Sequence, residues 1–324
     1  MHTIMRCEAA LSILACSSII FIYTRFPRMR TWSYTLVVIM VACSIGGNAA
    51  LFIAIEDPNE SQGLCIFQGV IVQFFDLAVS LWSVVIAYSL YTVVVLQQRI
   101  QGSFKRNCHV FVWGVSLMMT LVPFTTGSYG SAGMWCWIQA PAGDTQQWAH
   151  DAGTIWRILC MFLPIWINIF AIAFFYYRVS STIANYTRMS VILGAGRPNI
   201  QEMEKLSSSL YLFPVVFVAA WSVATASRGY HWAHPEDHNV QLAYLQITLG
   251  NGTVTQSIGN ALVYNSTRAV LARWQEVFAE LKVAVCSASG ADEMSKASIG
   301  EGAIGSAGNA GKKGLAEPLL NPMA

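Results

Sequence analysis

The chain has 324 residues, of which 55% are hydrophobic and only 11% are charged. A soluble domain carries roughly 25% charged residues because its surface faces water, so this composition excludes a soluble protein and predicts a surface covered mostly by lipid. The net charge of +2 is too small to argue for nucleic acid as a partner, and no basic cluster suggests one.

Charged residues divide the chain into apolar stretches long enough to cross a bilayer. A spanning helix needs about 20 mostly apolar residues, because roughly 30 Å of hydrocarbon is crossed at 1.5 Å per residue. The sequence therefore predicts an all-α membrane protein, a seven-transmembrane-helix bundle within residues 1–266. The predicted spans are residues 8–25, 30–56, 60–99, 106–123, 157–178, 205–228 and 237–268.

The distribution of Lys and Arg predicts the orientation of this bundle. Cytoplasmic loops of membrane proteins are enriched in these two residue types. Of the 19 Lys and Arg residues, 16 follow the first, third, fifth and seventh predicted spans, and only Arg6, Arg157 and Arg228 lie on the other side. We therefore expect a multi-pass protein of the plasma membrane with its N-terminus outside and its C-terminus in the cytoplasm.

The chain changes character after the last predicted span. Apolar residues recur at helical spacing within residues 267–285, and charged residues lie on the other faces, which predicts an amphipathic eighth helix lying against membrane lipid. Cys286 follows this helix and is either a lipidation site or a free thiol. Residues 286–324 are rich in Gly, Ala and Ser and contain no aromatic residue, which predicts a disordered cytoplasmic tail.

Two cysteines are predicted to lie on the outer, oxidising side of the membrane. Cys65 opens the third predicted span, and Cys136 lies in the loop after the fourth. We expect a disulfide between them, which would hold that loop over the mouth of the bundle. Cys7 is the rival partner on this side.

Asp76 is the only charged residue well inside a predicted span, about 16 Å below Cys65 and near the middle of the bilayer. A carboxylate at that depth is costly and marks a functional hypothesis. Gln73, Ser80 and Ser83 share its helix face. This polar stripe could line a ligand pocket, bind an ion or a proton, or join helices by hydrogen bonds. Thr248 and Asn251 belong to a comparable stripe in the seventh span.

Other motifs and absences narrow the function further. His231, His234 and His238 could bind zinc or sense pH, but clustered loop histidines are more often solvated, so we expect no metal. The seventh span contains no Lys, which excludes a retinal Schiff base. Without a nucleophile motif or a Walker loop, we expect neither an enzyme nor a cofactor.

Several motifs resemble one receptor family. The third span from Cys65 to Tyr91, the Trp-Cys-Trp-Ile sequence of residues 135–138, and Asn260 with Tyr264 are similar to sequences of the cyclic-AMP-receptor-like (class E) G-protein-coupled receptors. Pro214 and Trp221 of the sixth span also match the family pattern. The chain departs from this pattern where Phe213 replaces Tyr and Asn265 follows Tyr264 in place of Gly.

This resemblance implies a receptor that binds an extracellular small molecule, with a cyclic nucleotide as one candidate, and activates a heterotrimeric G protein. The alternatives are a transporter or an ion or proton channel that uses Asp76, and a scaffold that acts through its tail. The odd number of spans argues against the transporter. Candidate ligand-pocket residues are Gln73, Asp76, Ser80, Trp137, Arg157, Arg228, Thr248 and Asn251. Candidate activation-switch residues are Pro214, Trp221, Asn260 and Tyr264, and candidate G-protein contacts are Arg99, Lys105, Arg106 and Arg188.

Overall fold

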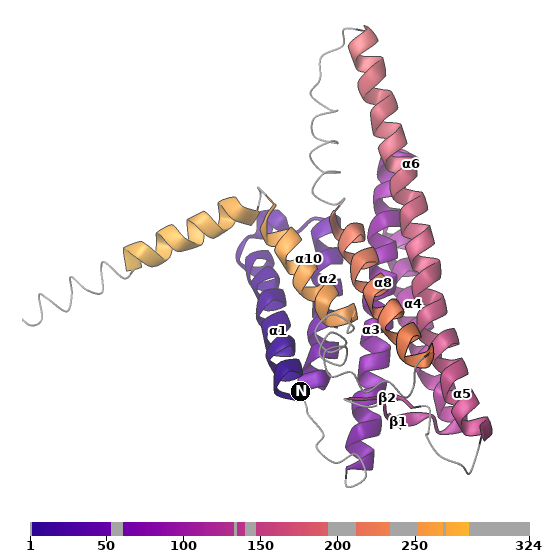
Figure 1. Cartoon of the computed structure of the whole chain (residues 1–324). Helices are drawn as coiled ribbons and strands as arrows, with labels where there is room; N and C mark the ends of the chain where they lie inside the picture. The colour runs from indigo at the N-terminus through magenta and orange to yellow at the C-terminus, as the bar shows by residue number, and fades with distance from the viewer. Residues whose placement is uncertain are drawn as a thin grey trace, which may run out of the picture. The chain divides into compact units, whose positions relative to one another are not determined.

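The computed structural model describes residues 2–52, 61–132, 135–139, 147–193, 212–233, 252–267 and 270–284. Most of these residues are helical, and the helices run up and down beside one another (Figure 1). The main helices are α1 His2–Arg25, α2 Trp32–Phe52, α3 Gln62–Val94, α4 Gly102–Leu121, α5 Gln147–Arg157, α6 Leu163–Leu193, α8 Leu212–Ala233 and α10 Gly252–Asn265. A π-helical turn, Ile158–Phe162, joins α5 to α6.

Described helices occur in each of the seven predicted spans and in the predicted order. Five stretches are long and apolar enough to cross a membrane: Thr3–Arg25, Trp32–Phe52, Gln62–Val94, Gly102–Thr126 and Ala152–Met189. In the sixth span, α8 contains a shorter apolar stretch, Val215–Ser227. In the seventh, α10 covers the second half of the predicted segment.

The first helix is longer than the charges indicated. We expected its span to begin at Glu8, but α1 begins at His2 and includes both Arg6 and Glu8. Charged side chains near the end of a helix can extend toward the headgroup region, so they do not have to end the helix. The charge pattern marked where the strongly apolar part starts, not where the helix starts.

Helix α3 forms the centre of the bundle. It packs against α2, α4, α6 and α8, and its N-terminal end also contacts the two strands. We call this end of the bundle outer and the opposite end inner, after the topology predicted from the sequence. Trp82 in the middle of α3 is fully buried, and its ring meets the rings of His109 and Trp113 on α4 edge-on. Polar side chains such as Gln73 and Ser80 are buried on the same helix, so its interior face is not purely apolar.

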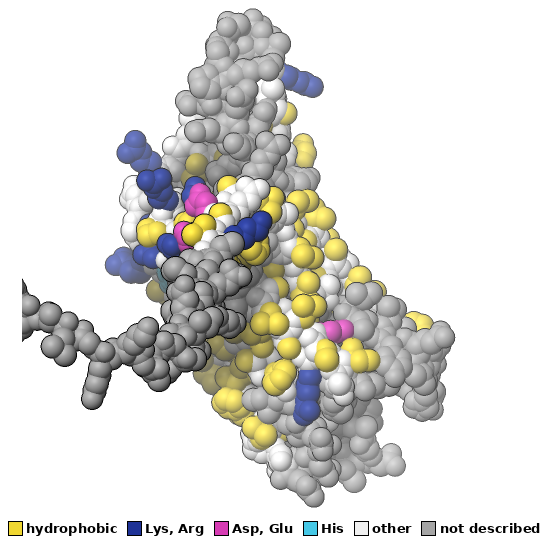
Figure 2. All heavy atoms as spheres, turned by 90° about the vertical axis from the view of Figure 1, so that its left-hand side faces the viewer, with side chains coloured by type: hydrophobic (Ala, Val, Ile, Leu, Met, Phe, Trp, Pro, Cys, Tyr) yellow, Lys and Arg dark blue, Asp and Glu magenta, His cyan; other side chains and the backbone are white. Residues whose placement is uncertain are grey.

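Large apolar side chains also cover the outer surface of the helices. Figure 2 shows them spread over the described part of the face that it draws. Exposed examples in the whole bundle are Leu14 on α1, Phe111 on α4 and Phe170 on α6. A water-soluble protein seldom exposes apolar patches of this extent, whereas lipid tails favour them. The surface therefore agrees with a protein that crosses a membrane.

The loop after α4 contains a short hairpin that the sequence did not lead us to expect. Strand β1, Tyr129–Ser131, pairs antiparallel with β2, Cys136–Ile138, with Gly130 opposite Trp137. The 3-10 helix Val122–Thr126 precedes the hairpin. Figure 1 shows the hairpin at the same end of the helices as the start of α1.

A second compact unit begins at Ala272. Residues 270–284 are helical, within the predicted amphipathic segment 267–285. The rings of Trp274 and Phe278 stack with their centroids 5.8 Å apart, and Arg273 forms an ion pair with Glu276 at 2.5 Å. The association of this helix with lipid remains a prediction, and Cys286 and the predicted tail lie outside the described residues.

Candidate functional site

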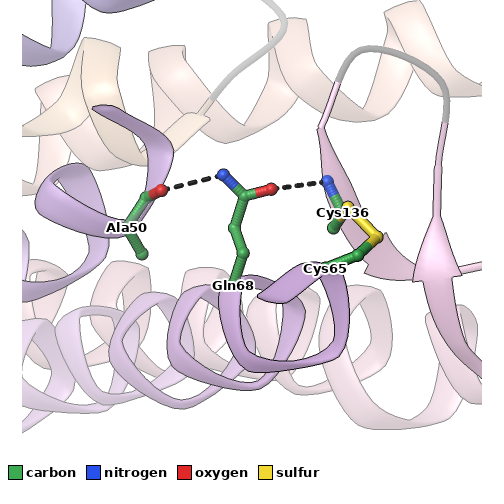
Figure 3. The surroundings of a disulfide bond; sticks show 4 residues. All are labelled: Ala50, Cys65, Gln68 and Cys136. Carbon is green, nitrogen blue, oxygen red and sulfur yellow. Dashed lines mark hydrogen bonds between the residues drawn. A yellow bond between two sulfur atoms is a disulfide. The ribbon is translucent and has the colours of Figure 1, made fainter. Parts of the chain in front are cut away.

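A disulfide attaches the hairpin to the outer end of α3. It joins Cys65 to Cys136, whose Cα atoms are 5.2 Å apart, and this confirms the predicted pair. Gln68 lies one turn further along α3 (Figure 3). Its amide nitrogen donates to the Ala50 carbonyl at 2.8 Å, and its amide oxygen accepts a bond from the Cys136 backbone N–H at 2.9 Å. One buried glutamine therefore connects α2, α3 and β2.

Gly69 allows the hairpin to approach α3 closely. A Cβ atom placed on Gly69 would lie 3.1 Å from the Cα of Trp137 and 3.1 Å from a ring carbon of Tyr129. The hydroxyl of Tyr129 donates to the Thr120 carbonyl at 2.8 Å, and burial raises the pKa of this hydroxyl. The strands thus rest directly on α3 at a point where no side chain intervenes.

The side chain of Trp137 connects the hairpin to the polar stripe of α3. Its indole N–H donates to the Gln73 side-chain oxygen at 2.7 Å, and the Gln73 amide donates to the Cys160 carbonyl at 3.0 Å. Cys160 lies in the π-helical turn, where the wider helix changes the usual backbone pairing. Hairpin, α3 and the α5–α6 junction are therefore connected through Gln73.

Arg157 lies at the end of α5, beside this connection. Its Nε donates to the Ile138 carbonyl at 2.6 Å, and its guanidinium lies 5.6 Å from the centroid of the Trp137 ring. Within the described residues, no partner is recorded for its two terminal nitrogens. Three predicted pocket residues, Gln73, Trp137 and Arg157, therefore meet at the outer end of the bundle.

The two remaining described pocket candidates lie deeper in α3. Asp76 is buried, and its Oδ1 would be 3.0 Å from a Cβ placed on Gly47, so the carboxylate lies directly against α2. Ser80 is fully buried and accepts a 2.8 Å hydrogen bond from Asn168 on α6. The predicted stripe therefore contacts different neighbouring helices at different depths.

A second polar network lies in the inner half of the bundle. The Trp221 indole on α8 donates to the Gln256 oxygen on α10 at 2.8 Å, and the Gln256 amide donates to the Ser83 hydroxyl on α3 at 3.2 Å. The sulfur of Met40 on α2 accepts contacts from Ser83 at 3.5 Å and from Asn260 at 3.8 Å. Four helices are thus linked by polar contacts through one buried region.

The rest of α10 completes this region. Tyr264 is buried, and its ring meets that of Tyr34 on α2 edge-on at 5.8 Å. Within the described residues, neither the Tyr264 hydroxyl nor the Asn260 side-chain oxygen has a hydrogen-bond partner. Such groups normally bond to protein or water when buried, so the inner half of α10 retains polar groups that another arrangement could satisfy.

The candidate G-protein contacts lie near the inner ends of the helices. Arg99, Arg106 and Arg188 are exposed, whereas the Lys105 nitrogen lies 5.0 Å from the centroid of the Trp32 ring. Gln97, which follows α3, hydrogen-bonds to the Tyr186 hydroxyl on α6.

Several predicted site residues cannot be placed. Thr248, Asn251, His234 and His238 lie outside the described residues, and the side chains of Arg228, Pro214 and His231 lie outside them too. Among the side chains that are described, no group of three or more His, Cys, Asp or Glu could hold a metal ion.

Sequence reasoning missed Gln68 and Met40, and also Cys160 and Asn168, which bond to the predicted stripe. Gln68 lies off the face that carries Asp76, so the stripe pattern did not select it. Met40 is one of many apolar residues in its span, and no local signal distinguishes its sulfur as an acceptor. The position of Gln68 one turn after Cys65 was the signal available for it.

Comparison with known proteins identifies the family to which this architecture belongs. The family model described as "Slime mold cyclic AMP receptor" matches residues 2–285. "G-protein coupled receptor 1" of Arabidopsis thaliana is 24% identical over 266 residues, covering 81% of this chain and 76% of that protein. "Cyclic AMP receptor 2" of Dictyostelium discoideum is 23% identical over 263 residues, covering 78% of this chain and 65% of that protein.

A solved structure confirms the fold. Squid rhodopsin superposes with a TM-score of 0.65 at 12% sequence identity, covering 86% of this chain and 84% of that one. At this identity the likeness shows the seven-helix fold alone. Family and fold together are those of a multi-pass membrane receptor of the G-protein-coupled type. The chain belongs to the slime mold cyclic AMP receptor family.

Proposed function

We propose that this protein is a plasma-membrane receptor that binds an extracellular small molecule and activates a heterotrimeric G protein. Its N-terminus would lie outside and its C-terminus in the cytoplasm, as the distribution of Lys and Arg favours. The observation that carries the proposal is the inner polar network, in which Gln256 links Trp221 to Ser83. A buried side chain that exchanges partners gives a bundle two discrete arrangements.

The ligand would bind in the outer half of the bundle. Trp137 and Gln73 connect the hairpin there to α3 and the α5–α6 junction, so a ligand that displaces this connection acts on three elements at once. The guanidinium of Arg157 favours an anionic group, because charge-assisted bonds to phosphate or carboxylate are stronger than neutral ones. A cyclic nucleotide carries such a group, and two relatives are named as cyclic AMP receptors.

Binding would act on the inner network by population shift. A ligand that prefers the arrangement with the Trp221–Gln256 bond broken would release α8 from α3 and α10, and the inner end of α8 could then move outward. Arg99, Lys105, Arg106 and Arg188 would then contact the G protein, and the groups of Asn260 and Tyr264 would find new partners.

Reconstitution tests this proposal. The full chain in nanodiscs is mixed with a heterotrimeric G protein, and nucleotide exchange is followed with a panel of extracellular metabolites that includes cyclic AMP. We expect at least one compound to accelerate exchange, and Arg157→Gln to weaken its binding if the compound is anionic. A compound that demonstrably binds but never accelerates exchange on any G protein tested would refute the receptor mechanism.

A further inference from the structure

The turn between α1 and α2 is basic and well fixed. Residues 25–30 read Arg-Phe-Pro-Arg-Met-Arg, and the three arginines are exposed. The short 3-10 helix Pro27–Met29 lies in this turn, and its Met29 side chain is buried. The Arg30 backbone N–H bonds to the Pro27 carbonyl at 3.1 Å. This turn therefore holds its cations on a defined backbone.

Two further contacts fix the direction of the cationic side chains. One terminal nitrogen of Arg30 donates to the Thr24 carbonyl at 2.9 Å, near the end of α1. The Lys105 nitrogen lies over the Trp32 ring, and the Trp32 indole donates to Ser89 on α3 at 3.4 Å. Because Trp32 follows Arg30 by two residues, Lys105 of α4 is brought to the basic turn. We call Arg28, Arg30 and Lys105 the cationic platform.

Within the described residues up to Leu271, no carboxylate lies beside the cationic platform. Among the described residues up to Leu271, the carboxylate residues are Glu8, Asp76 and Asp151. Glu8 lies at the opposite end of α1, Asp76 lies midway along α3, and Asp151 belongs to α5 beyond the hairpin. Gathered like charges repel one another unless an anion joins them, so the arrangement favours an anionic partner.

We propose that the cationic platform binds the phosphorylated headgroup of a phosphoinositide in the inner leaflet. The site rests on the orientation given under the proposed function, which places this end of the bundle in the cytoplasmic leaflet. The platform lies at the ends of three spanning helices, α1, α2 and α4, and therefore at the depth of lipid headgroups. The guanidinium group of an arginine can bind two phosphate oxygens at once. The cytoplasmic enrichment in positive charge would be met by any cation and does not require this geometry.

The fixed geometry of the platform favours selectivity. Arg30 and Lys105 are already held by Thr24 and Trp32, so less side-chain entropy is lost when a headgroup binds. A monophosphate diester such as phosphatidylserine satisfies fewer of these donors than a headgroup with additional phosphate monoesters. The platform should therefore distinguish the two lipids and not simply respond to total charge.

Native mass spectrometry of the full chain, released from detergent micelles, tests the site. Phosphatidylinositol bisphosphate, phosphatidylserine and phosphatidylcholine are offered separately. We expect selective retention of the bisphosphate lipid, and affinity lowered roughly tenfold in Arg28→Gln/Arg30→Gln and also in Lys105→Gln. The matched control is Arg178→Gln, which removes an exposed arginine of α6 and should leave lipid binding unchanged.

A second pair of variants tests the role of Trp32. Trp32→Phe keeps an aromatic ring beneath Lys105 and should retain lipid binding, whereas Trp32→Leu removes the ring and should weaken it. Equal retention of phosphatidylserine, or full binding by the double arginine variant, would overturn the proposal. If these variants abolish nucleotide exchange in bilayers without phosphoinositide while lipid binding is unchanged, the platform contacts the G protein instead. The micelle assay needs neither orientation nor G protein, so this proposal and the receptor mechanism fail separately.

Discussion

The indole N–H of Trp221 donates to the side-chain oxygen of Gln256 at 2.8 Å, which joins α8 to α10 inside the bundle. Both side chains are buried, so neither atom can form a hydrogen bond with water when the bond between them is broken. A buried polar group left without a partner costs more free energy than an intact hydrogen bond contributes. This pair is therefore a stabilising contact, and under the proposed function it is also a point at which activation would act.

Replacing Trp221 with Phe should destabilise the resting bundle. The substitution keeps an aromatic ring, although a smaller one, and removes the donor to Gln256, which should cost about 1–3 kcal/mol and lower the melting temperature in nanodiscs. If the bond restrains α8, basal nucleotide exchange should rise as well. The matched control is Trp166→Phe on α6, because no hydrogen bond of the Trp166 indole is recorded within the described residues. Equal effects of the two substitutions would contradict a specific role for the Trp221 bond.

Replacing Gly69 with Ala should separate the hairpin from α3. The added Cβ would meet the Trp137 backbone and the Tyr129 ring at 3.1 Å, and overpacking of this kind costs about 1–3 kcal/mol. Gly63→Ala, in the first turn of α3, has open space around its Cβ and should be neutral or stabilising by up to about 1 kcal/mol. Thermal unfolding of both variants measures these effects. An unchanged melting temperature in Gly69→Ala would contradict the prediction and show that the hairpin adjusts easily.

Replacing Asp76 with Asn tests the buried carboxylate. The change removes the charge with little change in volume, so the packing against Gly47 is kept. If Asp76 belongs to a ligand or ion site, ligand potency or its pH dependence should change while surface expression stays near normal. Loss of expression would favour a structural role, and unchanged signalling would remove Asp76 from the site. Ion flux in liposomes that the substitution blocks would instead favour the channel or transporter.

The orientation of the bundle can be read with epitope tags. We expect an N-terminal tag to bind antibody on intact cells and a C-terminal tag to bind only after permeabilisation. The physical reason is the positive charge near the ends of α1, α3 and α6, which disfavours transfer of these ends across the membrane. A C-terminal tag detected on intact cells would reverse the topology and move the cationic platform to the outer leaflet.

Spin labels test whether the helix of residues 270–284 lies on lipid. A label at Phe278 should be protected from water-soluble relaxation agents, and a label at Glu280 should be accessible to them. Both side chains are exposed within their own unit, so the difference would report the membrane itself. Equal accessibility at the two positions would rule out an interfacial helix.

The sequence was sufficient for the helices and for the disulfide. Charge spacing located the membrane segments because a bilayer tolerates few ionised groups, and this constraint acts on every residue of a span. The Cys65–Cys136 pair followed from placing both residues on the same side of the membrane. These conclusions required only local patterns and the side of each loop.

Contacts between helices were harder to predict. The pairing of Gln73 with Trp137 and Cys160 depends on the rotation of three elements, and no local pattern in the sequence specifies that rotation. Strands β1 and β2 are three residues each, and β1 contains Gly, so alternation could not distinguish them from an irregular loop. The role of Met40 required knowledge of which side chains surround its sulfur.

The π-helical turn Ile158–Phe162 has a consequence for how this chain tolerates insertions and deletions. Each extra residue in a helix rotates everything after it by about 100°. Arg157 faces the hairpin before the turn, and Asn168 faces Ser80 after it. The wide turn therefore sets the rotation about the helix axis between these two contacts. Deleting one residue there would restore a regular helix but rotate one contact away from its partner. A substitution at this turn would change one side chain, whereas a change in length would rotate a whole helix face.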